Sequence, residues 1–384
     1  MKNWRRLGMK SEWTKKKLSD IADFNPRETI KKGAIAKKIP MDVLRPFYRD
    51  IPYYVEECFS GGTKFRNGDT IMARITPCLE NGKTAQVSIL NDGAVGFGST
   101  EYIVFRAKEG IADKDYLYYL VCSPEVREPA IKSMVGSSGR QRVQTDVVKN
   151  LEIDVPPLVE QEKIGSFLKA FDDKIALNDR INKNLEQQVS VLYQSWFEDF
   201  EITNGVCPEN WSYQELSTIA DIASGKRPPV KSDTRNEKTP ISIVGAASVM
   251  GFTSEANHTD KILVTGRVGT HGVIQRFNTP CWTSDNTLVI TSPYYEFTNQ
   301  ILHRIDYSSM NRGSTQPLIT QGDMKKVVVL VPDEDTLAKF EEFAGSLMAK
   351  WEANNNENVK LASLRDTLLP KLMSGELDVS NIDL

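Results

Sequence analysis

The sequence predicts an α+β protein made of two globular units, each followed by a long helix, in which the two helices form an antiparallel coiled coil. Three observations support this fold class. A heptad pattern of apolar residues runs through residues 160–200, the pattern returns 176 residues later, and the two globular units begin with similar sequences. Repeats of this size indicate duplicated domains, so we predict pseudo-two-fold, circular symmetry.

The first long helix is predicted from its hydrophobic spacing. Between Ile164 and Trp196, apolar or amide residues alternate at steps of four and three without a break. This 3.5-residue period is typical of a helix that presents one narrow seam to a partner helix. No Pro or Gly interrupts the pattern after Gly165, and a helix over residues 160–200 would extend about 60 Å.

The partner helix lies in the same chain. The same spacing runs from Phe340 to Leu372, and two asparagines fall at the same heptad positions as in the first helix. A buried amide needs a hydrogen-bonding partner, so a seam asparagine fixes the register of a coiled coil. We expect these antiparallel pairs: Asn178 opposite Asn358, and Asn182 opposite Asn354. The alternative is two separate helices that each pack on their own globular unit.

The same register makes predictions about charged residues near the seam. It sets Arg365 opposite Phe171, which is a mismatch of a cation against an apolar ring. Asp172 and Asp173, beside Lys174, resemble the carboxylate cluster of a nuclease. Because all three flank the seam, we predict that they form a solvated face and not a catalytic site.

The globular units repeat each other as well. Residues 13–23 and 211–221 are identical at six of eleven positions. Short runs rich in β-branched residues, bounded by Gly, Asn or Pro, predict strands, and a helix is expected at residues 114–121. The predicted strands cover residues 70–74, 102–105 and 151–155 in the first unit, and 261–264, 287–290 and 327–331 in the second. We therefore predict a mixed or antiparallel sheet in each unit.

These features divide the chain into six parts. Residues 1–157 and 211–333 form the globular units, and residues 158–200 and 334–373 form the central and distal long helices. A linker that contains Gly and Pro occupies residues 201–210. A tail follows at residues 374–384, where Ser374 and Gly375 are expected to end the second helix.

Charge is segregated between these parts. Residues 1–150 carry 26 Lys and Arg against 18 Asp and Glu, whereas residues 151–210 carry 5 against 12. Residues 211–332 carry 12 against 10, and residues 333–384 carry 5 against 11. The globular units are thus basic and the helical segments acidic, which predicts that a polyanion is drawn to the globular units. The alternative is that long helices are simply rich in solvated Glu.

The remaining composition excludes several classes of protein. The five cysteines are scattered without a C-x-x-C motif and the three histidines lie elsewhere, so we expect reduced thiols and no metal site. The start of the sequence lacks the apolar segment of a signal peptide. No stretch approaches the roughly 18 apolar residues of a membrane-spanning helix. These features predict a cytoplasmic protein that does not enter a membrane.

No catalytic constellation is predicted. Residues 81–84 contain Gly-Lys-Thr, but Pro77 stands where a phosphate-binding loop requires an earlier glycine. Residues 224–227 fail in the same way. Neither an amino-methylation motif nor a methyl-donor loop is complete in this sequence.

Polar loops at matched positions of the two units form the candidate nucleic-acid interface. Arg can donate two hydrogen bonds to guanine, Gln and Asn can pair with adenine, Glu or Asp can accept from cytosine, and Ser, Thr and Lys suit phosphates. The candidates in the first unit are Arg74, Thr76, Lys83, Ser99, Glu101, Arg140, Gln141 and Arg142. Those in the second unit are Arg267, Thr270, His271, Ser284, Asn286, Thr315 and Gln316. Each residue alone fits an ordinary surface loop as well as it fits a nucleic-acid contact. The recurrence of polar loops at matched positions in both units favours a nucleic-acid interface for the set as a whole.

Several segments point to a known family. They are Val155-Pro-Pro-Leu-Val-Glu-Gln-Glu-Lys-Ile164, Phe171-Asp-Asp-Lys-Ile175, Asn178-Asp-Arg-Ile-Asn182, Leu18-Ser-Asp-Ile-Ala-Asp23 and the loop from Arg74 to Lys83. In these segments the chain resembles the specificity subunit of type I restriction–modification systems, and the similarity extends over nearly its whole length. The second copy departs from the pattern, because Val331-Pro332-Asp333 lacks the second proline and the Glu-Gln pair.

The resemblance implies a division of labour. Each globular unit would be a target recognition domain for one half of a split DNA sequence, and the helices would set the gap between the halves. Catalysis would lie in two methylation subunits, which modify adenine with S-adenosylmethionine, and in restriction subunits that use ATP and Mg²⁺. The implied partners are double-stranded DNA and these subunits, and the chain itself would hold no cofactor or metal.

Two other functions stay open at this point. A single-chain enzyme that modifies or cuts DNA would need an active site that no motif reveals, and the purified chain alone would then be active. A structural protein that uses its repeats for dimerisation would show no salt-dependent affinity for duplex DNA.

Overall fold

The computed structural model describes residues 12–310 and 318–378, which form two compact units. Unit 1 consists of Met1–Arg180 and Asn354–Leu384, and unit 2 consists of Ile181–Ala353. Each unit therefore contains one globular part, the first half of the long helix that follows it, and the second half of the other long helix. The division predicted from the sequence follows the helix ends instead, and it stays a prediction.

Unit 1 is built on two four-stranded sheets. One is antiparallel with the order β2-β9-β6-β7, and the other has the order β4-β3-β8-β5 with β3 parallel to β8. A separate antiparallel pair joins β1 to β10. The strands are β1 (Thr14–Lys17), β2 (Ala22–Phe24), β3 (Ile35–Ile39), β4 (Val55–Cys58), β5 (Thr63–Phe65), β6 (Thr70–Ala73), β7 (Thr84–Gln86), β8 (Gly96–Gly98), β9 (Tyr102–Ala107) and β10 (Glu152–Val155). The short helices are α1 (Leu18–Ile21), α2 (Lys114–Cys122), α3 (Pro124–Lys132) and α4 (Thr145–Lys149).

Unit 2 repeats this plan. Its antiparallel sheet has the order β12-β18-β15-β16, its second sheet has the order β14-β13-β17 with β13 parallel to β17, and β11 pairs with β19. The strands are β11 (Ser212–Glu215), β12 (Asp221–Ser224), β13 (Ile241–Val244), β14 (Val249–Thr253), β15 (Ile262–Gly266), β16 (Gln275–Phe277), β17 (Cys281–Thr283), β18 (Thr287–Thr291) and β19 (Val328–Val331). The helices are η1 (Glu201–Thr203), η2 (Leu216–Thr218), α6 (Tyr295–Arg304) and α7 (Gln321–Lys325). Within its described residues, unit 2 has no counterpart of β5 or α3.

The predicted elements of both units are confirmed. The six strands expected from the sequence are β6, β9, β10, β15, β18 and β19, and the helix expected at residues 114–121 is α2. Each unit contains both predicted arrangements, one antiparallel sheet and one mixed sheet. Helix α2 begins where the Asp113 side chain accepts the backbone N–H groups of Asp115 and Tyr116.

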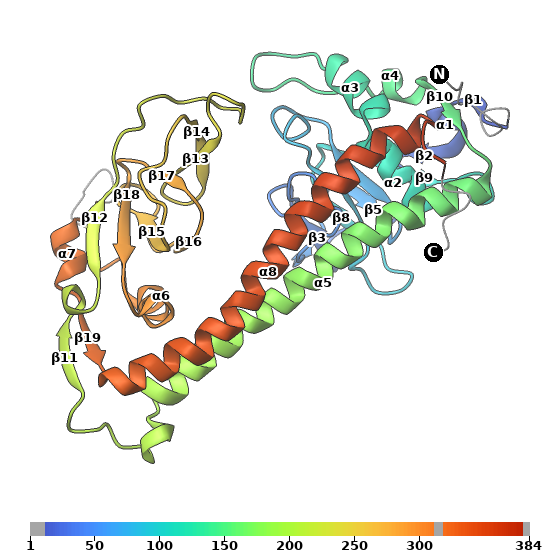
Figure 1. Ribbon diagram of the computed structural model, residues 1–384. Helices are drawn as coiled ribbons and strands as arrows, with labels where there is room; N and C mark the ends of the chain where they lie inside the picture. Colours follow the sequence, from blue (N-terminus) through green and yellow to red (C-terminus); the bar gives the residue numbers. More distant parts are fainter. Residues whose placement is uncertain (1–11, 311–317, 379–384) are drawn as a thin grey trace. The chain divides into compact units, whose positions relative to one another are not determined.

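The two long helices are α5 (Leu158–Phe197) and α8 (Glu334–Met373), of 40 residues each (Figure 1). Helix α5 ends three residues before the predicted boundary at residue 200, and Phe200 itself adopts a left-handed conformation with φ of 54°. Helix α8 ends as predicted, just before Gly375, whose φ of 67° is the conformation that favours glycine after a helix.

The two helices pack against each other in antiparallel order. In unit 1, Asn178 donates from Nδ2 to Oδ1 of Asn358 at 2.9 Å, which confirms that predicted pair. In unit 2, Asn182 donates to the carbonyl of Trp351 at 3.3 Å. These contacts exclude two separately packed helices. Asn354 belongs to unit 1, so its predicted pairing with Asn182 would join the two units and stays a prediction.

One expectation about the seam was wrong, and its correction resolves the mismatch at Arg365. Asp172 is only 5% exposed, whereas we expected it on a solvated face. It accepts hydrogen bonds from the guanidinium of Arg365 and, at 2.5 Å, from the hydroxyl of Tyr119. Burial raises the pKa of Asp172, although the charge of Arg365 opposes this shift. The cation at the seam is therefore neutralised by a buried carboxylate one residue beyond Phe171.

Each globular part is completed by the end of a long helix. In unit 1, Leu369, Leu372 and Met373 of α8 lie in the same hydrophobic core as residues of β9 and α2. In unit 2, Phe197 of α5 lies 4.9 Å from Phe297 between ring centroids, within a core that includes residues of α6. Burial of aromatic rings of this size is among the larger contributions to core stability.

A tryptophan at the start of each unit bonds the beginning of the long helix that follows. Trp13 donates its indole N–H to Glu160 at 3.1 Å, and Trp211 donates to Asp333 at 2.8 Å. These are the residues with which the repeated opening sequences begin. Across the described residues, no helix has both the length and the apolar character needed to cross a membrane.

Candidate nucleic-acid interface

Three loops of unit 1 meet at the end of β6. The backbone N–H of Arg74 donates to the carbonyl of Glu101 at 2.9 Å, and the carbonyl of Arg74 accepts from Val143, also at 2.9 Å. Thr76 donates its backbone N–H to the carbonyl of Gln141 at 3.0 Å. Most of the predicted site residues of this unit are thereby brought together, and we call them the unit 1 loop cluster: Arg74, Thr76, Ser99, Glu101, Gln141 and Arg142.

An ion pair organises the side chains of the unit 1 loop cluster. Arg142 donates from Nε to both carboxylate oxygens of Glu101, at 2.9 and 3.0 Å, and from Nη2 to Oε1 at 2.7 Å. This pairing raises the pKa of Arg142 above its ordinary value. The Nε atom of Arg74 lies 3.9 Å from the same carboxylate, and Ser99 Oγ accepts the backbone N–H of Glu101 at 3.1 Å. The Glu101 carboxylate is therefore held between two guanidinium groups.

Two predicted residues of unit 1 lie outside this cluster of contacts. Lys83 donates its ammonium to the carbonyl of Met41 at 2.9 Å, so its charge is engaged within the fold. Arg140 is exposed, and its backbone N–H donates to the carbonyl of Ser137 at 3.0 Å in the turn that precedes Gln141. Their roles as DNA contacts stay predictions.

The same backbone arrangement recurs in unit 2. Arg267 donates its N–H to the carbonyl of Asn286 at 2.8 Å, and its own carbonyl accepts from Ile319 at 3.0 Å. Arg267 therefore occupies the place of Arg74, and Asn286 occupies the place of Glu101. This match between loops that the sequence paired only by position is the most specific feature of the candidate interface.

The remaining candidates of unit 2 differ in accessibility. Thr270 is exposed, and His271 Nδ1 lies 3.0 Å from the carbonyl of Gly266. Gly266 allows this tight loop, because a Cβ atom there would lie 1.8 Å from the carbonyl oxygen of Thr270. Thr315 and Gln316 lie outside the described residues.

Ser284 is the one candidate in the described chain that lies beneath the surface. It is 1% exposed, and its backbone N–H donates to the carbonyl of Val244 at 3.0 Å. In this conformation its hydroxyl cannot reach a partner molecule. This hydroxyl has no hydrogen-bond partner among the described residues, and the role of Ser284 as a DNA contact stays a prediction.

A basic segment that was not predicted from the sequence lies beside the unit 2 loops. Residues 225–240 contain five basic and two acidic residues, and Arg227 Nε lies 3.7 Å from Asp285, next to Asn286. All five basic side chains are exposed: Lys226, Arg227, Lys231, Arg235 and Lys238. The charge run was a usable signal, but this stretch was considered only as a failed phosphate-binding loop.

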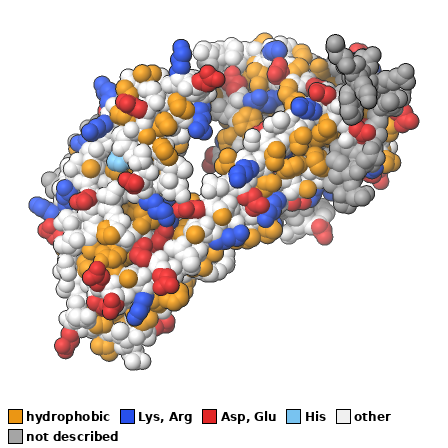
Figure 2. All heavy atoms as spheres, in the orientation of Figure 1, with side chains coloured by type: hydrophobic (Ala, Val, Ile, Leu, Met, Phe, Trp, Pro, Cys, Tyr) orange, Lys and Arg blue, Asp and Glu red, His pale blue; other side chains and the backbone are white. Residues whose placement is uncertain are grey.

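Charge on the face shown in Figure 2 is mixed, with Lys and Arg interspersed among Asp and Glu. Most of the unit 1 cations described above have an acidic or carbonyl partner within the fold. The candidate interface therefore depends on particular loops more than on one continuous basic patch.

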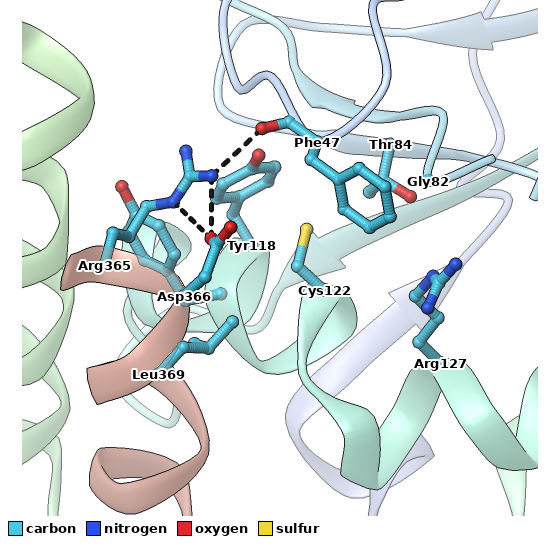
Figure 3. A pocket seen from close by; sticks show the side chains of 10 residues that line it. Phe47, Gly82, Thr84, Tyr118, Cys122, Arg127, Arg365, Asp366 and Leu369 are labelled. Atoms are coloured by element: carbon cyan, nitrogen blue, oxygen red, sulfur yellow. Dashed lines mark hydrogen bonds and ion pairs between the residues drawn. The ribbon is translucent and has the colours of Figure 1, made fainter. Parts of the chain in front are cut away.

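Unit 1 contains one small cavity beside α8 among those found in its described residues. Its volume is about 40 Å³, and Phe47, Cys122 and Arg365 are among the residues that line it (Figure 3). Arg365 closes one side by donating to Asp366 at 2.8 Å and to the carbonyl of Phe47 at 3.2 Å. Burial raises the pKa of the Cys122 thiol to about 12, so the thiol stays protonated and unreactive near neutral pH.

Comparison with known proteins adds a consistent set of relatives. The family described as type I restriction modification DNA specificity domain matches residues 10–187. The type I restriction enzyme MjaIX specificity subunit of Methanocaldococcus jannaschii is 26% identical over 313 residues, which cover 72% of this chain and 71% of that protein. The HindI specificity subunit of Haemophilus influenzae is 21% identical over 403 residues, covering 81% and 87% respectively. The crystal structure of the type I restriction–modification S subunit from M. genitalium has a similar fold, with a TM-score of 0.56 and 18% identity over 94% of this chain and 96% of that one.

Proposed function

We propose that this chain, which belongs to the family of type I restriction–modification specificity subunits, recognises a DNA sequence in two separate halves and positions the methylation and restriction subunits on it. In this proposal the chain binds DNA and catalyses no reaction itself. S-adenosylmethionine, ATP and Mg²⁺ are bound by the partner subunits.

The observation that supports this function most is the recurrence of one loop arrangement in both units. Arg74 and Arg267 have the same two kinds of backbone partner, and each lies at the end of the corresponding central strand. Loops fixed in this way hold side chains ready for base edges and phosphates. Two copies of such a surface in one chain suit a target that consists of two half-sites.

The long helices have two roles in this proposal. Each has 40 residues and therefore extends about 60 Å, so a continuous helix can set the gap between the half-sites. Their exposed apolar side chains offer surface for two methylation subunits, one for each repeat. Examples on α5 and α8 are Leu177, Val191, Phe343, Val359 and Leu364.

The first test measures DNA binding by the chain assembled with its methylation subunits. Arg74→Ala and Arg267→Ala should each weaken binding, with a loss on the order of tenfold for one base or phosphate contact. Assembly with the methylation subunits should be unchanged, because neither residue lies on the long helices. Lys132→Ala, which removes an exposed cation of unit 1 outside the loop cluster and off the long helices, is the control that should retain full affinity.

Mapping the methylated adenines then tests the two-part target. The wild-type complex should modify a sequence with two specified halves and an unspecified gap of constant length. A single continuous target, or gel-shift affinities that are identical for Arg74→Ala and the wild type, would contradict the proposed function.

A further inference from the structure

The backbone of Arg142 is fixed from both sides. Its N–H donates to the carbonyl of Val135 at 2.9 Å, and its carbonyl accepts from the N–H of Val135 at 3.0 Å. The residues before and after Arg142 bond to the segment that follows β6. The side chain of Arg142 therefore starts from a backbone with a defined position.

The side chain of Arg142 is held as well, and one of its edges stays available. Glu101 occupies the edge formed by Nε and Nη2, whereas Nη1 has no hydrogen-bond partner among the described residues. A guanidinium group is planar, so the edge formed by Nη1 and Nη2 then presents two parallel N–H groups in a fixed plane. The side chain is 47% exposed, so a partner can reach this edge.

Glu101 also changes what Arg142 can bind. A lone arginine is attracted to any phosphate, irrespective of sequence. The carboxylate of Glu101 neutralises the charge of Arg142, so general attraction to phosphates is reduced while the two directional donors are kept. Such donors match O6 and N7 of guanine in the major groove, the commonest specific contact of arginine with DNA. Prior immobilisation also lowers the entropic cost of making that contact.

At the matching position, the described residues of unit 2 hold no such arginine–carboxylate pair. The isolated bridge between Ile75 and Arg142 in unit 1 corresponds to the bridge between Val268 and Leu318 in unit 2. A leucine therefore stands where unit 1 has Arg142, and Asn286 stands where it has Glu101. The two units share the matched arginines Arg74 and Arg267 but differ at the adjacent pair.

We propose that Arg142 recognises a guanine in the half-site bound by unit 1, that Glu101 is its positioning residue, and that the half-site bound by unit 2 has no guanine requirement at the matching place. This inference rests on the proposed function, since it names the base and the residues of one recognition surface. It also predicts that the two halves of the target differ.

The experiment uses the full chain assembled with its methylation subunits and a set of duplexes in which each target position carries all four base pairs in turn. Wild type is measured first, to establish its base preferences. Arg142→Lys keeps the charge but loses the parallel donors, so it should reduce the preference for guanine at one position of one half-site on the order of 10- to 100-fold. Preferences at the other positions should be unchanged.

Glu101→Gln gives a second, independent readout. Removing its charge should raise affinity for unrelated DNA and steepen the salt dependence, while the preference for guanine at the same position falls. A residue that only stabilises the loop would not shift these quantities in opposite directions. The control pair is Lys132→Ala and Glu128→Gln, which removes an exposed ion pair of unit 1 outside the loop cluster and should leave all preferences unchanged.

The outcomes separate the two levels of inference. If wild type shows no sequence preference, the proposed function fails and this inference fails with it. If wild type is sequence-specific but Arg142→Lys lowers affinity equally for all duplexes, or leaves every preference intact, Arg142 contacts phosphate or nothing, and only this inference is overturned. Thermal unfolding of each variant confirms that the loops are compared in folded protein.

Discussion

In each unit the N-terminus of a short helix lies against a long helix, at positions that match between the units. The two units differ in which segment supplies the carboxylate that caps the short helix. In unit 1 that position of α5 is Gly165, where a Cβ atom would lie 2.7 Å from both the Asp113 carboxylate and the backbone nitrogen of Tyr116. The glycine lets the start of α2 approach closely, and α2 supplies its own capping carboxylate from Asp113.

In unit 2 the residue 176 positions later is Glu341, and the capping carboxylate comes from the long helix. Glu341 accepts the backbone N–H groups of Glu296 at 3.1 Å and Phe297 at 2.8 Å, at the start of α6. The residue that precedes α6, Tyr294, provides no side-chain cap. Each helix start thus receives one carboxylate, and the units differ in which helix supplies it.

A second pair of matched positions, in the seam between the long helices, also carries different side chains in the two units. Asp172 and Arg365 form a buried ion pair in unit 1, and the residues related to them by the 176-residue offset are Met348 and Val189. Both of these lie in the apolar core of unit 2. The duplicated plan therefore preserves where the elements meet, whereas the chemistry of each contact differs between the copies.

The largest effect is expected from breaking the ion pair of unit 1. Arg365→Ala would leave Asp172 buried without its cation, which should lower the free energy of unfolding by about 3–5 kcal/mol. The double variant Asp172→Met, Arg365→Val imitates unit 2 and should recover part of this loss, because an apolar pair needs no desolvation of charge. Recovery is incomplete because the buried hydroxyl of Tyr119 loses its acceptor. Urea unfolding of the full chain measures both.

Lys360→Ala is the control for this comparison, since it removes an exposed cation from the same helix. It should change the free energy of unfolding by less than about 0.5 kcal/mol. If the double variant proves less stable than Arg365→Ala alone, the two seams are not interchangeable and the comparison between the units does not hold.

The next effect concerns pH and Glu341. Burial raises the pKa of Glu341 to about 7 from its ordinary value of 4.5. The unfolded chain releases this proton at lower pH than the folded chain does. The contribution of Glu341 to the free energy of unfolding is therefore fully present below about pH 4.5 and is lost as the pH rises through about 7. The loss should be on the order of 2–3 kcal/mol by pH 8.

Glu341→Gln removes the titrating group but can still accept from the start of α6. We expect the stability of this variant to decline less than that of the wild type between pH 5 and pH 8. Above about pH 7 the variant should be the more stable of the two. Thermal unfolding across this pH range is the measurement, with Glu342→Gln, an exposed neighbour, as the control. A Glu341→Gln variant with the wild-type pH profile would show that this carboxylate titrates normally.

The smallest effect compares two helix glycines. Gly165→Ala should destabilise the protein by about 1–3 kcal/mol, because the new methyl group meets the backbone of α2. Gly345→Ala in α8 meets nothing within 4 Å and should stabilise it by about 0.5–1 kcal/mol through helix propensity. If both variants raise the unfolding temperature, or both lower it, the close approach of α2 to Gly165 is contradicted.

Sequence periodicity predicted the elements that depend on local pattern. The spacing of apolar residues located both long helices, and the seam asparagines gave the register that Asn178 and Asn358 confirm. It could not assign Asp172 correctly, because a heptad pattern describes contacts with one partner helix. Tyr119, which bonds Asp172, comes from a third element that the pattern does not describe.

For the candidate interface, the sequence predicts which residues belong to the loops but not how their side chains contact one another. Matching the two copies identified Arg74 and Arg267 as equivalent before their shared backbone partners were known. The pairing of Glu101 with Arg142 joins loops 41 residues apart, and no local signal specifies such a contact. The hydrogen bond from Lys83 to the carbonyl of Met41, 42 residues away, has no local signal either, and the role of Lys83 as a DNA contact stays a prediction.

The participation of α8 in the core of unit 1 has a consequence for biosynthesis. Leu369, Leu372 and Met373 are among the last described residues to leave the ribosome, yet they pack with strands and helices made much earlier. The globular part of unit 1 is thus translated well before α8, and its core cannot be completed until the end of α8 has been made. Until then the apolar surface that α8 covers stays exposed and open to chaperone binding, and a truncation before Leu369 should destabilise the globular part of unit 1.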